Sequence, residues 1–209
     1  MQFFNGFLFL NLIFISSFSI NGHTFEDIII ERPIRRIDAR ELFVEYYNNE
    51  APVIGKATDI TLQLTIYNFQ TRQNEGGKEG IIFIKIHQSW KDHRFTFKGR
   101  VTSLPDLEER IWKPNICVTN AIDDKTISKN VDIFENSTVS YTQLKQLSFP
   151  VINGNVTINF EDIPLTTNEV KNTISISEVI LNPSVSTKVS YQIENKNTLN
   201  MVSLILKIK

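Results

Sequence analysis

The chain has 209 residues, with 22 lysines and arginines against 23 aspartates and glutamates, so its formal net charge of −1 offers no basic surface to a nucleic acid. A composition that is 41% hydrophobic and 22% charged is typical of a globular protein with a core, and it predicts one folded domain. The single cysteine, Cys117, excludes an intramolecular disulfide and a cysteine-based zinc site, and the three histidines share no ligand spacing, so we expect no metal site.

The first twenty residues contain no charged side chain and carry an apolar stretch from Phe7 to Ile15, followed by small residues. This pattern predicts a cleaved secretory signal over residues 1–19 and a mature domain over residues 20–209. An uncleaved membrane anchor is the alternative, although asparagines and serines dilute the segment. We therefore expect a secreted, extracellular chain with no transmembrane span in its mature part, glycosylated at the sequons of Asn136 and Asn155.

The elements that follow are mostly β-strands. Residues 37–47 place apolar side chains at helical spacing and predict one short N-terminal helix. From Asp59 apolar and polar residues alternate, which indicates a half-buried strand, and a second long strand, 81–90, follows a polar break. The alternation recurs at Phe95/Phe97, Val139/Tyr141, Val156/Ile158/Phe160, Ile174/Ile176, Val189/Tyr191/Ile193 and Val202/Leu204/Leu206/Ile208. Many short strands separated by turn residues predict an all-β fold, an immunoglobulin-like antiparallel β-sandwich.

No catalytic constellation stands out, so we expect a protein that is not an enzyme and needs no cofactor. The motifs of serine hydrolases, phosphate-binding loops and zinc proteases are absent from the sequence. The acidic pairs Glu108–Glu109 and Asp123–Asp124 are predicted to lie in solvated turns, because adjacent strand residues point to opposite faces. Cys117 lies between apolar neighbours and is interpreted as a small buried side chain, with a reactive thiol as the alternative.

Two short motifs carry a family resemblance. Residues 90–95 read WKDHRF, and residues 111–115 read IWKPN shortly before Asn120 and Ala121. Together with the predicted helix and the two long strands, they resemble the extracellular domain of the pentameric ligand-gated ion channels, the Cys-loop receptor family, and its soluble acetylcholine-binding relatives. The resemblance extends over residues 37–209 and implies the same sandwich fold.

The resemblance implies scaffold roles for the residues of both motifs, which are Trp90, Asp92, Arg94, Trp112, Pro114 and Asn115. Indole rings suit the end of a sandwich, because they are large and apolar with one N–H group. An aspartate accepts local hydrogen bonds in a turn, and a proline fixes a bend. Ligand contact by either tryptophan is the less favoured interpretation.

The loop that names the family corresponds to residues 156–170, with Pro164 at its proline and Val156 and Val170 at its two cysteines. Since both cysteines are missing, we expect the two valines to pack in place of the bridge. A bridge across such a loop is worth about 3 kcal/mol in the loop-closure model, part of which the apolar pair would replace. The changed loop suits a chain that has no membrane domain to contact.

In this family the ligand lies between subunits, within a cage of aromatic rings. The resemblance places Lys85, Thr119 and Ser177 at three ligand-binding positions where the family has rings. Without those rings we expect no binding of a quaternary amine, whereas the ammonium group of Lys85 favours an anionic or carboxylate-bearing ligand. Seven residues, 194–200, separate the last two predicted strands, so the flap over the ligand is expected to be shortened.

The resemblance implies a secreted, soluble paralogue of a neurotransmitter-gated ion-channel ligand-binding domain, which binds a small ligand or receptor subunits at subunit interfaces. We expect a pentamer, formed by self-association or with related receptor subunits. Association with receptor subunits would bring the chain to a membrane. A truncated subunit of an extracellular ligand-gated ion channel is the alternative, because the chain ends in a strand and a basic residue like those before the family's first transmembrane helix. A generic extracellular adhesion sandwich is the second alternative.

Overall fold

The computed structural model describes residues 43, 46–96, 100–102, 107–164, 170–195, 198 and 200–209, with the backbone alone at 100–102. The predicted signal segment and most of the predicted helix, 37–47, lie outside the described residues. The described chain is dominated by strands, as the alternating pattern of apolar residues predicts.

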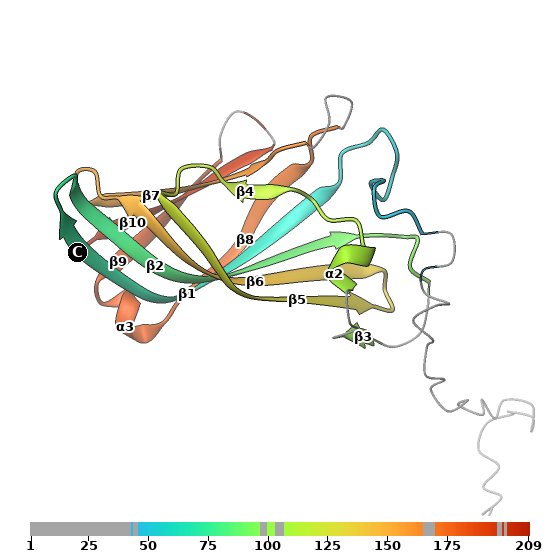
Figure 1. The fold of residues 1–209 in the computed structure, drawn as a ribbon, viewed down its shortest axis with the longest axis horizontal. Helices are drawn as coiled ribbons and strands as arrows, with labels where there is room; N and C mark the ends of the chain where they lie inside the picture. Colours follow the sequence, from blue (N-terminus) through green and yellow to red (C-terminus); the bar gives the residue numbers. More distant parts are fainter. Residues whose placement is uncertain are drawn as a thin grey trace, which may run out of the picture. The chain divides into compact units, whose positions relative to one another are not determined.

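The larger of two sheets has six strands in the order β3–β5–β6–β2–β1–β8 (Figure 1). These strands are β1 (Asp59–Asn74), β2 (Gly77–Lys91), β3 (Arg100–Thr102), β5 (Asp123–Phe134), β6 (Thr138–Pro150) and β8 (Thr173–Leu181). Within this sheet β1 and β8 run parallel, whereas the other neighbours are antiparallel. The antiparallel prediction therefore holds for all of these pairs except the one at the β8 edge.

The smaller sheet has four strands in the order β4–β7–β10–β9. These strands are β4 (Ile116–Val118), β7 (Asn155–Asp162), β9 (Val189–Asn195) and β10 (Met201–Ile208). Two one-turn helices, α2 (Leu107–Arg110) and α3 (Pro183–Ser186), lie in connections between strands. Neither of them, nor any other helix in the described part of the chain, has the length and hydropathy needed to span a bilayer.

The core is formed by the inward-facing residues of both sheets, which belong to one cluster of buried side chains. Leu62 and Ile84 represent the larger sheet and Ile158 and Leu204 the smaller one, and all four are fully buried. Burial of each such side chain stabilises the fold by about 1.5–3 kcal/mol. The two-layer arrangement confirms the predicted all-β sandwich.

The two sheets are in close contact at Gly80 of β2. A Cβ atom added to Gly80 would lie 2.9 Å from Cγ2 of Val156 in β7, a distance that side-chain carbons do not adopt. The glycine therefore allows the fully buried Val156 to pack directly on the backbone of β2.

The strand predicted at Phe95 is wrong. Phe95 follows β2 in a turn, where its backbone N donates a hydrogen bond to the carbonyl oxygen of Asp92 at 3.1 Å. Phe97, the other half of the predicted pattern, lies outside the described residues. Phe95 is therefore apolar because it is buried in this turn, and not because it belongs to a strand.

The solvated turn predicted at Asp123 and Asp124 is also wrong. Both residues belong to β5, where they pair with Ser148 and Leu147 of the long strand β6. Asp124 compensates its charge through an ion pair with Lys145 at 2.8 Å. A polar sequence can therefore form strand here because β6 supplies a full row of backbone partners.

Candidate functional site

The turn after β2 is built around the fully buried carboxylate of Asp92. Its Oδ1 accepts hydrogen bonds from the backbone N and Nε of Arg94 at 3.2 and 2.8 Å, and its Oδ2 accepts from Nη2 of Arg94 at 2.7 Å. Nη1 of Arg94 donates to the carbonyl oxygens of Tyr47 and Glu50 at 3.0 and 2.9 Å. The arginine thus joins the end of β2 to the segment that precedes β1.

Tyr46 completes this cluster. Its ring stacks on Phe95 at 4.6 Å, and the guanidinium carbon of Arg94 lies 4.2 Å from its centroid. Its hydroxyl donates to Oδ2 of Asp92 at 2.9 Å and accepts from the backbone N of Trp112 at 2.9 Å. Burial and the neighbouring carboxylate of Asp92 raise the pKa of Tyr46, so the hydroxyl remains a donor.

The two tryptophan motifs meet in the structure. The rings of Trp90 and Trp112 form an edge-to-face pair with centroids 5.9 Å apart. Nδ2 of Asn115 donates to the carbonyl oxygen of Ile163 at 2.8 Å, and the backbone N of Ile163 donates to the carbonyl oxygen of Asn115 at 3.0 Å. Together with the buried Pro114, these contacts fix the second motif to the end of β7.

Glu108 lies in α2 and not in the solvated turn that the sequence predicts. Its Oε1 accepts hydrogen bonds from Lys113 at 3.0 Å, Lys129 at 2.9 Å and the hydroxyl of Tyr141 at 2.8 Å. Partial burial alone would raise its pKa, but the three hydrogen bonds outweigh that effect and lower the pKa to about 2. The carboxylate therefore links α2, the second motif, β5 and β6.

Lys85 lies on β2 between Thr65 of β1 and Leu144 of β6, on the outward face of the larger sheet. It lines a groove of about 550 Å³, together with aromatic, aliphatic, hydroxyl and basic side chains, among them Tyr67, Phe83, Leu144, Thr142 and Lys129. Bulges in β1 and β5 bend the strands that border the groove.

Lys85 differs from Lys129, the other lysine that lines the groove, because the ammonium group of Lys85 has no acidic partner among the described residues. Lys129 is engaged by Glu108, whereas no described residue accepts a hydrogen bond from the ammonium group of Lys85. Nδ1 of His87, two residues along β2, forms a hydrogen bond with Oγ1 of Thr142 at 2.8 Å. Burial, together with the charge of Lys85, lowers the pKa of His87, so its imidazole is neutral at pH 7.

The other two predicted ligand-binding residues lie elsewhere. Ser177 lies on the edge strand β8, where its hydroxyl donates to the carbonyl oxygen of Leu62 at 3.2 Å. Lys85 is two strands away, roughly 10 Å or more at ordinary strand spacing. Thr119 is exposed and follows β4 in the smaller sheet. One subunit therefore does not bring the three side chains together.

The expectation that Val156 and Val170 pack together is wrong. Val156 is fully buried near the start of β7, whereas Val170 is 45% exposed and lines a cavity with Asp162 and Pro164 near the other end of that strand. Asp162 lies six positions after Val156 along the strand, a distance of about 20 Å. The apolar alternation from Val156 makes this segment a strand, so residues 156–170 do not form a single loop.

The two sequons differ in environment. Asn136 is exposed in the turn between β5 and β6, where its Oδ1 accepts a hydrogen bond from the backbone N of Thr138 at 3.1 Å. Asn155 is half-buried at the first position of β7. Glycosylation of both residues stays a prediction, and Asn136 has the more accessible side chain.

Cys117 is half-buried in β4 and not fully buried as expected. Its thiol lies 3.6 Å from Oδ1 of Asn115. Burial is the largest of the effects that raise its pKa, so the thiol is a poor nucleophile at neutral pH.

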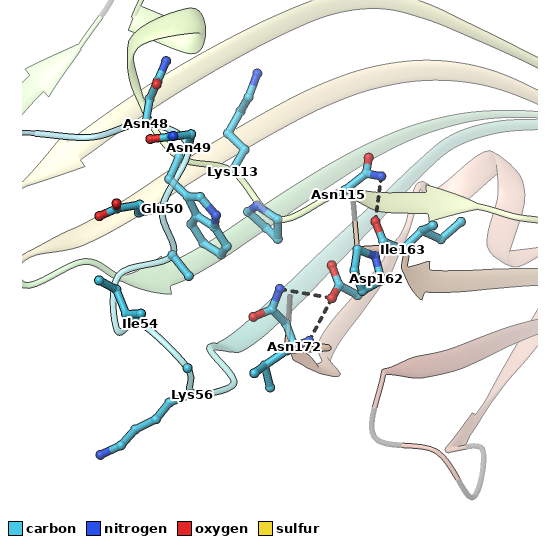
Figure 2. A pocket seen from close by; sticks show the side chains of 16 residues that line it. Asn48, Asn49, Glu50, Ile54, Lys56, Lys113, Asn115, Asp162, Ile163 and Asn172 are labelled. Carbon is cyan, nitrogen blue, oxygen red and sulfur yellow. Dashed lines mark hydrogen bonds between the residues drawn. The ribbon is translucent and has the colours of Figure 1, made fainter. Parts of the chain in front are cut away.

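A cavity of about 270 Å³ lies where the segment before β1, the second motif and the ends of β7 and β8 converge (Figure 2). Its most buried charged side chain is Asp162, which is 2% exposed and hydrogen-bonded to Asn172. Sequence reasoning missed this residue, although Asp162 continues the buried phase of Ile158 and Phe160 in β7. The signal that could identify it is a carboxylate at a position of the strand where the alternation predicts a buried apolar residue.

Among the described residues, no group of three or more histidines, cysteines, aspartates and glutamates is placed to hold a metal ion.

Comparison with known proteins identifies the family of the chain. A comparison with curated proteins returned no match. The model of the neurotransmitter-gated ion-channel ligand binding domain matches residues 38–171, which include both tryptophan motifs and the strands from β1 to β7. This family consists of ligand-binding domains of ion channels and not of enzymes. The chain therefore belongs to the neurotransmitter-gated ion-channel ligand-binding domain family.

Proposed function

We propose that this chain is a secreted, soluble member of the family that binds a small carboxylate-bearing ligand in the groove around Lys85. The observation that carries the proposal is the combination of a groove of about 550 Å³ with an ammonium group that no described residue neutralises. The predicted signal over residues 1–19 and the exposed sequon at Asn136 support secretion.

The chemistry of the groove favours an anion. A carboxylate about 4 Å from the ammonium group gains about 4 kcal/mol at an effective dielectric constant near 20, and a ligand cation at that distance loses as much. Tyr67 and Phe83 supply aromatic surface for the body of the ligand. The neutral imidazole of His87 adds no second cation.

The groove is open on the outward face of the sheet, so a neighbouring subunit is proposed to cover it. Members of the family typically assemble as pentamers. A ring closed by head-to-tail contacts presents a different face of the next subunit to each groove. Assembly with related receptor subunits would complete the site in the same way.

Calorimetry tests this proposal with glutamate, GABA, acetylcholine and choline. We expect glutamate or GABA to bind the wild type, and Lys85→Gln to weaken that binding at least about tenfold. Lys78→Gln is the matched control, because it removes the same charge from the exposed start of β2. Lys78→Gln should leave the affinity unchanged.

Two results would contradict the proposal. The first is acetylcholine or choline binding in the micromolar range by the wild type, because Lys85 should repel a quaternary amine. The second is equal affinity of the wild type and Lys85→Gln for the carboxylate ligand.

A further inference from the structure

We propose that the cavity beside Asp162 is a second ligand site, which binds a compact organic cation bearing an N–H group. This site goes beyond the proposed function, because its lining shares no residue with the groove around Lys85. It lies within one subunit, between the segment before β1, the second tryptophan motif and the described residues 162–164, 170 and 172 (Figure 2).

Asp162 provides an acceptor directed at this cavity. Its Oδ2 accepts hydrogen bonds from the backbone N and Nδ2 of Asn172 at 2.8 and 3.0 Å, and Oδ1 of Asn172 accepts from the backbone N of Thr58 at 3.0 Å. These bonds hold the carboxylate in one orientation. No described residue donates to its Oδ1, and no described lysine, arginine or histidine pairs with it.

A carboxylate that is 2% exposed and has no cationic partner among the described residues is an unusual feature of a folded protein. Buried charges are ordinarily paired, because removal of an ion from water is costly. A ligand cation in the adjoining cavity would supply the missing partner for Asp162.

The other charged side chains of the lining do not supply that partner. Figure 2 shows the ammonium groups of Lys56 and Lys113 directed away from Asp162, and the carboxylate of Glu50 directed away as well. Lys113 is held by Glu108 at 3.0 Å. Asp162 therefore sets the charge preference of the cavity.

The walls indicate the rest of the ligand. Trp112, Pro114 and Ile163 offer aromatic and aliphatic surface, which suits the apolar body of an organic ammonium ion. The volume of about 270 Å³ equals that of roughly nine water molecules in the liquid, enough for a ligand of about ten non-hydrogen atoms. One inward carboxylate is a poor site for a divalent metal ion, which takes several oxygen ligands.

The experiment is a titration of the full secreted chain with phenethylamine, followed by calorimetry and tryptophan fluorescence. Both tryptophans report on the site, because Trp112 lines the cavity and contacts Trp90. We expect phenethylamine to bind the wild type, with 2-phenylethanol and choline at least about tenfold weaker, since the first lacks the charge and the second lacks an N–H group.

Variants separate Asp162 from its surroundings. Asp162→Asn should weaken phenethylamine binding at least about tenfold, while Glu50→Gln, which removes an exposed carboxylate from the same cavity, should leave it unchanged. Lys85→Gln should also leave it unchanged, so that a failure of the groove proposal and a failure of this one are told apart.

Three outcomes would overturn the proposal: no binding of phenethylamine by the wild type below about 10 mM, equal affinity in a folded Asp162→Asn, or equal affinity for 2-phenylethanol. If Asp162→Asn does not fold, Ala51→Leu decides the question. It narrows the cavity without changing its charge, so undiminished binding by that variant contradicts the site.

Discussion

Replacement of Asp92 by asparagine removes the carboxylate that joins the turn after β2 to the segment before β1. The two carboxylate oxygens receive three hydrogen bonds from Arg94 and one from the hydroxyl of Tyr46. Asparagine keeps one acceptor oxygen and turns an amino group toward the remaining donors. The substitution therefore leaves the guanidinium group of Arg94 without its ion-pair partner.

The loss of unfolding free energy in Asp92→Asn depends on how deeply the ion pair is buried. Loss of one partner of a buried ion pair costs about 3–5 kcal/mol. The side chain of Asp92 is 0% exposed, but that of Arg94 is 24% exposed, so solvent stabilises part of the freed charge. We therefore expect the lower end, about 3 kcal/mol of unfolding free energy. At about 2–4 °C per kcal/mol for a chain of this size, the thermal midpoint should fall by about 6–12 °C.

Thermal unfolding followed by circular dichroism measures this effect. Asp124→Asn is the matched control, because it removes a carboxylate from an ion pair in which Asp124 is 34% and Lys145 13% exposed. A pair near the surface is worth about 0–1 kcal/mol, so the control should lower the midpoint by no more than about 4 °C. Equal shifts for the two variants would refute the structural role assigned to Asp92.

Four further predictions concern other parts of the molecule. The pKa of Glu108 lies at about 2, below its ordinary value of 4.5, so the contribution of this carboxylate to stability is complete above pH 4.5 and is lost as the pH falls toward 2. The thermal midpoint should therefore fall less between about pH 5 and about pH 2 in Glu108→Gln than in the wild type. Gly80→Ala should cost about 1–3 kcal/mol in urea unfolding, and Gly80→Ala with Val156→Ala should lose less than the sum of the two single losses. Cysteines introduced at Val156 and Val170 should stay reduced under oxidising conditions, and a disulfide found by mass spectrometry would show that the two positions are close. Cys117 should react with iodoacetamide much more slowly in the native protein than in urea at pH 7, and equal rates would contradict its burial and raised pKa.

The sandwich could be predicted from the sequence because its strands are half-buried. Every second residue is buried throughout β7, from Ile60 to Ile66 in β1 and from Ile82 to Trp90 in β2, and most of these buried positions are apolar. The same rule explains the error over Val156 and Val170. The spacing of the family's loop pairs Val156 with Val170, but the alternation of buried residues from Val156 to Asp162 is unbroken and makes this segment a strand.

The polar networks could not be predicted, because they join residues far apart in the chain. Glu108 receives hydrogen bonds from residues 21 and 33 positions further along, Lys129 and Tyr141. Their meeting depends on the pairing of β5 with β6, which local patterns do not specify. Asp162 is an intermediate case: its burial follows from the alternation, but its contact with Asn172, ten positions further along the chain, does not.

Native mass spectrometry of the purified chain, with and without glutamate, is the most direct test of the proposed assembly and ligand site. We expect a pentamer that retains glutamate in the wild type and loses it in Lys85→Gln. A monomer at micromolar concentration, or a pentamer of Lys85→Gln that retains glutamate as the wild type does, would refute the proposed function.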